Sequence, residues 1–200
     1  MKRKQQHRQW FLPACLGLAA IVGVSSACLA VPNDTAPADK KAEVVVTPWQ
    51  SQCAADTCTL SHTIGAQDAD AIHAVFSVDK KTAAVTVVTF DVPADAEKVR
   101  GITISFGSAP GPEGKVSLAP GTSVVLALSG CDDKKCTTEI HGGKIDVGKP
   151  DMYDVTRNFL RHGHFFIGFY RAGNFVGKNM SLAGFGRDYA GLLAKIKSGK

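Results

Sequence analysis

Four cysteines are the residues of this chain best suited to chemistry, and they form two pairs with the same spacing. Four residues separate Cys53 from Cys58, and four separate Cys131 from Cys136. Four-residue connections are common in β-hairpins, so a disulfide across each turn is geometrically sensible. A zinc site with all four thiolates as ligands is the alternative, since zinc motifs use similar spacings. Redox-active dithiols have the closer Cys-x-x-Cys spacing, which neither pair has.

Two histidines are the next candidates, because His162 and His164 flank a single glycine. Alternate residues of a strand share a face, so this spacing could place two imidazoles side by side as metal ligands. No cysteine or carboxylate with matching spacing completes the site, and surface or hydrogen-bonded histidines explain the pattern more simply. We therefore predict no cofactor and no resident metal, and keep His162 and His164 as the candidate ligands.

The chain offers no clear catalytic nucleophile. Ser129 and Ser181 both lie outside the Gly-x-Ser-x-Gly elbow of α/β-hydrolases. The paired aspartates of segments 68–70 and 132–133 lie in polar, turn-like sequence, where aspartates are usually solvated or cap the backbone. The residue types therefore predict a protein that is not an enzyme.

The first 30 residues have the pattern of a secretory signal. Residues 2–8 contain four basic side chains and no acid, residues 11–24 are almost wholly apolar, and small residues follow up to Ala30. This order predicts export with cleavage after Ala30. An uncleaved membrane anchor is the alternative, but the apolar run is shorter than the roughly 20 residues that span a bilayer comfortably.

Cys28 opens a second processing route. The sequence Ser26-Ala27-Cys28 resembles the lipobox of bacterial lipoproteins, although Ser25 stands where Leu or Val is usual. Acyl chains on Cys28 would tether the protein to a membrane face, and this is the only membrane association that the sequence suggests. Both routes remain open from the sequence alone.

The compartment favours disulfides over zinc. Removing or lipidating the N-terminal cysteines leaves four, an even number, in an oxidising environment. Each pair can close across its own short turn without help from the fold. We therefore predict the bonds Cys53–Cys58 and Cys131–Cys136.

The net charge of +5 belongs mostly to the export signal. Four of the 23 basic residues and none of the 18 acidic residues lie in residues 1–30, so the rest of the chain is close to neutral. Binding to nucleic acid without sequence preference needs many phosphate contacts. The charge balance argues against a nucleic-acid partner.

Beyond the signal, the sequence predicts a linker and one mainly β domain. Residues 31–42 are rich in Pro, Ala, Asp and Lys and lack apolar periodicity, which is typical of a flexible linker. Residues 43–200 contain many short β-like segments separated by Gly, Pro and Asp, a pattern that favours a sandwich or barrel. The expected strands are 57–64, 73–78, 83–92, 99–106, 124–128, 137–140 and 165–170, with a β-branched run at 44–46. Helices are expected at 152–161 and 182–196, the second capped by Ser181 and stopped at Gly199.

The densest apolar feature is an aromatic run at positions 165, 166, 169, 170 and 175. The first interpretation is that these residues form a central strand and its neighbour in the core, since alternate residues of one strand cannot all be exposed. The second interpretation is that they form an exposed patch that contacts a partner.

Several of these motifs together resemble the invasion-associated locus B family of exported proteobacterial proteins. They are Trp49-x-x-x-Cys53-x-x-x-x-Cys58, Pro120-Gly121, Ser129-Gly-Cys131-x-x-x-x-Cys136 and Ser181-Leu-x-Gly-Phe185, and the resemblance covers roughly residues 45–195. Lys135 stands where the family usually has a glycine before its last cysteine. The resemblance implies an immunoglobulin-like β-sandwich and an envelope or virulence-associated role without an assigned activity.

These observations favour an exported, non-enzymatic envelope protein that contributes to host-cell interaction or invasion. Its expected location is the periplasm, the outer envelope or the medium, and its expected partners are host-surface or envelope proteins. Two alternatives remain: a periplasmic metal-handling factor using His162 and His164, and an accessory structural module of the envelope.

Overall fold

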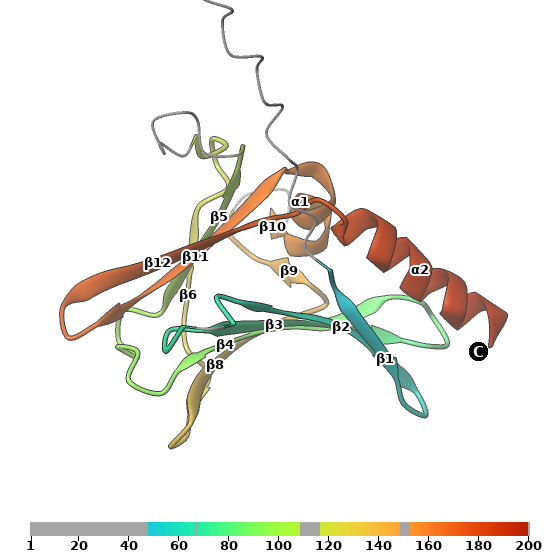
Figure 1. The fold of residues 1–200 in the computed structure, drawn as a ribbon, viewed down its shortest axis with the longest axis horizontal. Helices are drawn as coiled ribbons and strands as arrows, with labels where there is room; N and C mark the ends of the chain where they lie inside the picture. Colours follow the sequence, from blue (N-terminus) through green and yellow to red (C-terminus); the bar gives the residue numbers. More distant parts are fainter. Residues whose placement is uncertain (1–47, 67, 109–116, 149–152, 200) are drawn as a thin grey trace, which may run out of the picture. The chain divides into compact units, whose positions relative to one another are not determined.

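The computed structural model describes residues 48–66, 68–108, 117–148 and 153–199 (Figure 1). The chain divides into two compact units, residues 1–41 and 42–200, and every described residue belongs to the second. The predicted signal, Cys28, the linker 31–42 and the run 44–46 lie outside the described residues.

The larger of the two main sheets has six antiparallel strands in the order β1-β2-β3-β4-β8-β7. The chain forms the first four as consecutive neighbours, and β8 then pairs with β4. Strand β2 has the predicted bounds. The strands are β1 (Gln50–Cys53), β2 (Thr57–Ile64), β3 (Ile72–Asp79), β4 (Val85–Pro93), β7 (Gly130–Cys131) and β8 (Lys135–His141).

The smaller main sheet has four antiparallel strands in the order β12-β11-β5-β6. They are β5 (Ile102–Gly107), β6 (Val124–Leu126), β11 (His164–Arg171) and β12 (Asn174–Ser181). Strand β5 begins later than predicted, because Val99 lies fully exposed in the preceding turn. A short pair, β9 (Lys144–Ile145) with β10 (Tyr153–Asp154), leads into helix α1 (Val155–Arg161), and helix α2 (Phe185–Ser198) ends the domain.

The two main sheets pack face to face over one apolar core. Strand β3 buries every second residue, from Ile72 to Val78, as the period of two requires. Contact between the sheets includes the rings of Phe90 in β4 and Phe165 in β11, which stack with centroids 5.4 Å apart. This confirms the predicted class: a mainly β, immunoglobulin-like sandwich with a C-terminal helix and two disulfides.

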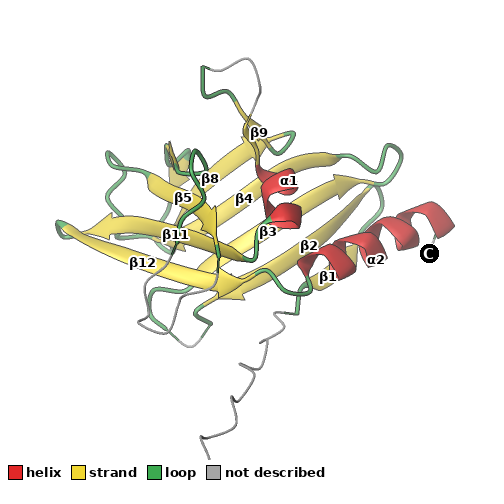
Figure 2. Ribbon diagram, turned by 90° about the horizontal axis from the view of Figure 1, so that it is seen from above, coloured by secondary structure: helices red, strands yellow, loops and turns green. Residues whose placement is uncertain are grey.

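An aromatic cluster joins the two helices to the sandwich. Phe159 of α1 is its centre, with ring centroids 4.9 Å from Phe76, 4.7 Å from Phe165 and 5.0 Å from Phe185. Trp49 packs against the same rings and is almost fully buried. Figure 2 shows the result, with α2 lying alongside β1 and β2.

Helix α2 ends as predicted but begins differently. Lys195 and Lys197 lie in the last turn, and Gly199 caps the end in a left-handed conformation. The expected N-cap, Ser181, instead ends strand β12, and its hydroxyl accepts a hydrogen bond from the backbone N–H of Ala183. Gly184, with φ 97°, is the N-cap and has no side chain to offer. The chain has to turn sharply between strand and helix, which a glycine with positive φ allows.

Asp188 in the first turn of α2 fastens the start of the domain to the helix. Its carboxylate accepts hydrogen bonds from the backbone N–H of Trp49 at 3.1 Å and from Arg187 at 2.8 Å. The bond from Arg187 is the largest cause that lowers the pKa of Asp188, and the Trp49 N–H lowers it further.

We expect Asp188→Asn to reduce the free energy of unfolding by about 1 kcal/mol near neutral pH, because the charge-assisted bonds weaken. A carboxyl whose folded pKa is depressed stabilises the fold fully above its unfolded pKa of about 3.9, and this contribution is lost as pH falls through the lower folded pKa. Urea titrations of both proteins should therefore differ at pH 7, and the difference should shrink only as pH falls below about 4. A difference that is independent of pH would mean that the Asp188 charge plays no part.

Candidate functional site

The four predicted cysteines form two disulfides, Cys53–Cys58 and Cys131–Cys136, as expected. In each pair the two residues lie directly opposite each other at the end of a hairpin, with Cα atoms 4.0 Å apart. With every one of these sulfurs in a disulfide, the four cysteines cannot form a thiolate zinc site. Disulfides of this kind are typical of an oxidising location outside the cytoplasm.

The two candidate metal ligands do not lie on one strand. His162 is the C-cap residue of α1, and its ring packs against Phe106 with centroids 5.6 Å apart. His164 is the first residue of β11, and its ring lies 6.4 Å from that of Phe166. Among the described residues, no three metal-binding side chains come close enough to hold an ion. The idea of two imidazoles on a shared strand face was therefore wrong, since only His164 belongs to the strand.

His164 is nevertheless an unusual group. Its Nδ1 atom is buried and has no hydrogen-bond partner in the described structure. Burial lowers the pKa of His164, so the imidazole is neutral near pH 7. A neutral ring with an unused nitrogen can donate or accept one hydrogen bond.

The aromatic run divides between the two faces of the four-stranded sheet. Phe165 and Phe169 point into the core and are fully buried. Phe166 and Tyr170, at alternating positions of β11, point to the opposite face, and the strand pairing places Phe175 of β12 directly opposite Tyr170. The run is therefore core at Phe165 and Phe169 and exposed at Phe175. We call the side of this sheet that carries Phe166, Tyr170 and Phe175 the outer face.

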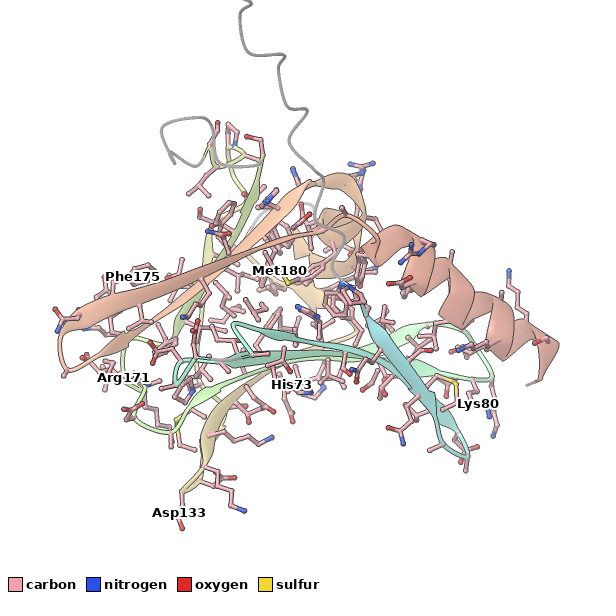
Figure 3. The ribbon with its side chains drawn as sticks, in the orientation of Figure 1. His73, Lys80, Asp133, Arg171, Phe175 and Met180 are labelled. Atoms are coloured by element: carbon pink, nitrogen blue, oxygen red, sulfur yellow. A yellow bond between two sulfur atoms is a disulfide. The ribbon has the colours of Figure 1, made fainter. Side chains whose placement is uncertain are left out.

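Phe175 is held as an exposed ring on this outer face. Its side chain is 54% exposed, and the ring lies over Gly168 and Gly177, which face each other on β11 and β12. A methyl group at Gly168 would overlap the ring. The edge of the ring meets Tyr170 with centroids 5.2 Å apart, and the guanidinium of Arg100 stacks over Tyr170 at 4.3 Å. Figure 3 labels Phe175 near the end of the β11–β12 hairpin.

Two clefts adjoin each other on the outer face. The aromatic cleft, about 350 Å³, is bordered by Phe166 and Phe175 together with hydroxyl and amide side chains. The basic cleft, about 680 Å³, is bordered by Arg161, His162 and His164. Leu118 borders both clefts and is 48% exposed. Ligand sites in proteins have volumes of this order and a similar mixture of apolar walls and a few polar groups.

Two histidines that the motif analysis did not single out lie on opposite faces of the six-stranded sheet, His62 on the side of Leu60 and Ile64 and His73 on the outer, more polar side. The Nδ1–H of His62 donates a hydrogen bond to the carbonyl oxygen of Pro48 at 3.1 Å, and burial is the main cause that lowers the pKa of His62. The Nδ1 of His73 lies 3.0 Å from the hydroxyl oxygen of Thr63. Both rings border a cleft of about 240 Å³. The pairing of Thr63 with His73, which no short motif encodes, places the two histidines at neighbouring positions of β2 and β3.

Thr63, His73 and Asp91 are paired across β2, β3 and β4, but they do not form a catalytic relay. Asp91 lies directly across from His73 on β4, but its oxygens bind Lys135 at 2.7 Å and Thr137 at 2.8 Å. A relay needs the carboxylate to orient the imidazole. The hydrogen bonds instead fasten β4 to β8.

The paired aspartates of the sequence have separate structural uses. Asp132 caps its turn by accepting hydrogen bonds from two backbone N–H groups, as predicted. Asp68 and Asp70 instead form ion pairs across the sandwich, with Lys178 at 2.8 Å and with Arg171. These contacts hold the β11–β12 hairpin against the turn between β2 and β3.

No protein-family model, curated protein or solved structure matches the chain. The resemblance to the invasion-associated locus B family therefore stays a prediction from the motifs. Within the described part of the chain, no helix has the length and apolar character needed to cross a membrane.

Proposed function

We propose that this protein is an exported, non-enzymatic binding protein of a bacterial envelope, and that it contributes to interaction with host cells. The signal-like pattern of residues 1–30 supports export, either with removal of Cys28 or with its lipidation. The two disulfides support an oxidising destination, which is the periplasm, the outer envelope or the medium. The motif resemblance to the invasion-associated locus B family supports the role toward host cells.

The observation that carries the proposal is the exposed apolar surface on the outer face. Leu118, Val125 and Phe175 are 48%, 68% and 54% exposed, and they account for three of the five large apolar side chains exposed in the described part of the chain. Val125 pairs with Thr103, which places it on this face. Clustered exposed apolar side chains with a polar rim mark interaction sites.

The test begins with the full chain, carrying a C-terminal tag and expressed in a Gram-negative bacterium. We expect the tagged protein in the periplasmic, outer-envelope or medium fraction, with a mass that corresponds to cleavage before Cys28 or after Ala30. The processed protein should then bind cultured animal cells in a saturable manner. Protein retained in the cytoplasm with residues 1–30 intact would refute the proposal.

The outer face is tested on the same processed protein. Replacing Val125 and Phe175 together by serine should reduce cell binding by about tenfold or more, since loss of an apolar contact centre usually costs over 1.4 kcal/mol. Val99→Ser is the control, because Val99 is fully exposed in the turn before β5 and borders neither cleft. Equal losses in both variants, or no saturable binding by the unaltered protein, would contradict the proposal.

A further inference from the structure

We propose that the two clefts on the outer face together bind an acidic glycan, with a sugar ring stacked on Phe175 and an anionic group at Arg161. This inference rests on the proposed function, because it names the ligand class of the same binding face. It follows from the held ring of Phe175, the polar side chains around it and the charge of the adjoining cleft.

Phe175 has the properties of a stacking platform. Its ring is more than half exposed, yet it is held from below by Gly168 and Gly177 and from the side by Tyr170. The negative face of an aromatic ring attracts the slightly positive C–H groups on the face of a sugar ring. Because the platform is already fixed, a ligand loses little affinity to ordering it.

The side chains around the platform favour a glycan over an acyl chain. Thr103, Ser105, Ser123 and Asn179 border the aromatic cleft, and their side chains form no hydrogen bond with another described residue. An acyl chain would cover these hydroxyl and amide groups without pairing them, which costs free energy. The hydroxyl groups of a glycan can donate to them and accept from them.

The adjoining cleft favours a negative charge on the ligand. Arg161, His162 and His164 border it, and no acidic side chain borders either cleft among the described residues. Arg161 is exposed and forms no ion pair with another described residue, so its guanidinium can pair with a carboxylate or sulfate. The charge of Lys178 is already engaged by Asp68, which leaves Arg161 as the principal cation.

The length of the face favours an oligosaccharide over a single sugar. His164, Phe166, Gly168 and Tyr170 are alternate residues on one side of β11. Six residue steps along a strand span about 20 Å. The shared border at Leu118 joins the clefts, so one extended ligand can reach from Phe175 to Arg161.

The experiment measures binding of the processed, disulfide-bonded protein by isothermal titration calorimetry. The probes are a heparin-derived hexasaccharide, neutral maltohexaose, and vesicles of phosphatidylglycerol. We expect the acidic hexasaccharide to bind at least about tenfold more tightly than maltohexaose, a difference of about 1.4 kcal/mol. Preference for the vesicles, or for neither oligosaccharide, would overturn the glycan proposal.

Four variants locate the site. Phe175→Ala removes the platform, Gly168→Ala keeps the ring but displaces it, and Arg161→Gln removes the cation. Each should weaken binding of the acidic hexasaccharide by about tenfold, while Lys197→Gln, an exposed cation on α2, should leave it unchanged. Circular dichroism verifies that each variant is folded. Unchanged affinity in Phe175→Ala and Gly168→Ala, or an equal loss in Lys197→Gln, would overturn the proposal.

The results separate this inference from the function on which it rests. Cell binding that depends on Val125 and Phe175 without any oligosaccharide binding would refute the glycan and leave the binding face in place. Absence of cell binding, with glycan binding retained, would refute the host-cell role and leave the glycan site in place.

Discussion

Replacing Phe185 by alanine is expected to reduce the free energy of unfolding by about 3–5 kcal/mol, the usual cost of truncating a buried aromatic side chain. Phe185 is fully buried at the start of α2. Its ring centroid lies 5.0 Å from that of Trp49, 5.2 Å from Phe76 and 5.0 Å from Phe159. The truncation would therefore leave a cavity where the N-terminal segment, the six-stranded sheet and both helices meet.

Urea denaturation of the processed protein measures this loss. Phe175→Ala is a matched control, since it removes the same atoms from a ring that is 54% exposed, and it should cost less than about 1 kcal/mol. A cost below about 1 kcal/mol for Phe185→Ala would mean that α2 is peripheral to the fold. The Ser181-Leu-x-Gly-Phe185 motif would then be better explained as a binding element.

The sequence was most informative where one face of an element is buried. Strand β2 alternates Cys58, Leu60 and Ile64 with polar residues, and its predicted bounds are correct. Helix α2 repeats apolar residues at helical spacing, and of these Phe185, Leu192 and Ile196 are buried while Tyr189 is partly buried. Local periodicity is sufficient in such cases because burial imposes it.

The bounds of strand β12 were not predicted, because it lies at the edge of the sheet and half of its residues are exposed. Phe175 and Val176 are adjacent, Gly177 follows, and Lys178 occupies a position on the inner side. That sequence does not alternate as a half-buried strand should. Lys178 is tolerated there because Asp68 pairs with it, and an inward-pointing charge is also a device that protects an edge from pairing with other chains.

The candidate site depends on pairing between strands, which a motif search does not contain. The register of β11 against β12 sets Gly168 opposite Gly177 and Tyr170 opposite Phe175. This register places both glycines beneath the Phe175 ring. In the sequence, the aromatic run and the histidines are separate features. The face of the sheet to which each side chain points depends on the residue at which β11 begins.

Both disulfides lie at the margins of one sheet, and this location determines what they stabilise. β1 and β7 are the outermost strands at opposite edges of the six-stranded sheet, and all their residues are exposed. An edge strand without buried side chains has little to fix its register. Each disulfide joins such a strand to its better buried neighbour, β1 to β2 and β7 to β8.

We therefore expect each single disulfide to contribute about 2 kcal/mol, the chain-entropy value for so short a loop. Cys53→Ser and Cys131→Ser are the suitable variants, because they change the exposed partner and leave Cys58 and Cys136 as buried thiols that keep their packing. The bridges are about four strand spacings apart across the sheet, roughly 19 Å, so the two losses should add to about 4 kcal/mol.

Denaturant titration of the two single variants and the double variant tests this expectation, with Gln52→Ser as a control for a polar change on the exposed strand β1. The control should change stability by less than about 0.5 kcal/mol. Both single variants should fold, since their expected loss is smaller than the roughly 5–15 kcal/mol of a typical domain. If Cys53→Ser alone prevented folding, the Cys53–Cys58 bridge would have to stabilise more of the domain than the β1–β2 hairpin. The stabilisation would then come from the packing of β1 against α2, where Lys195 binds Ser51 at 2.9 Å.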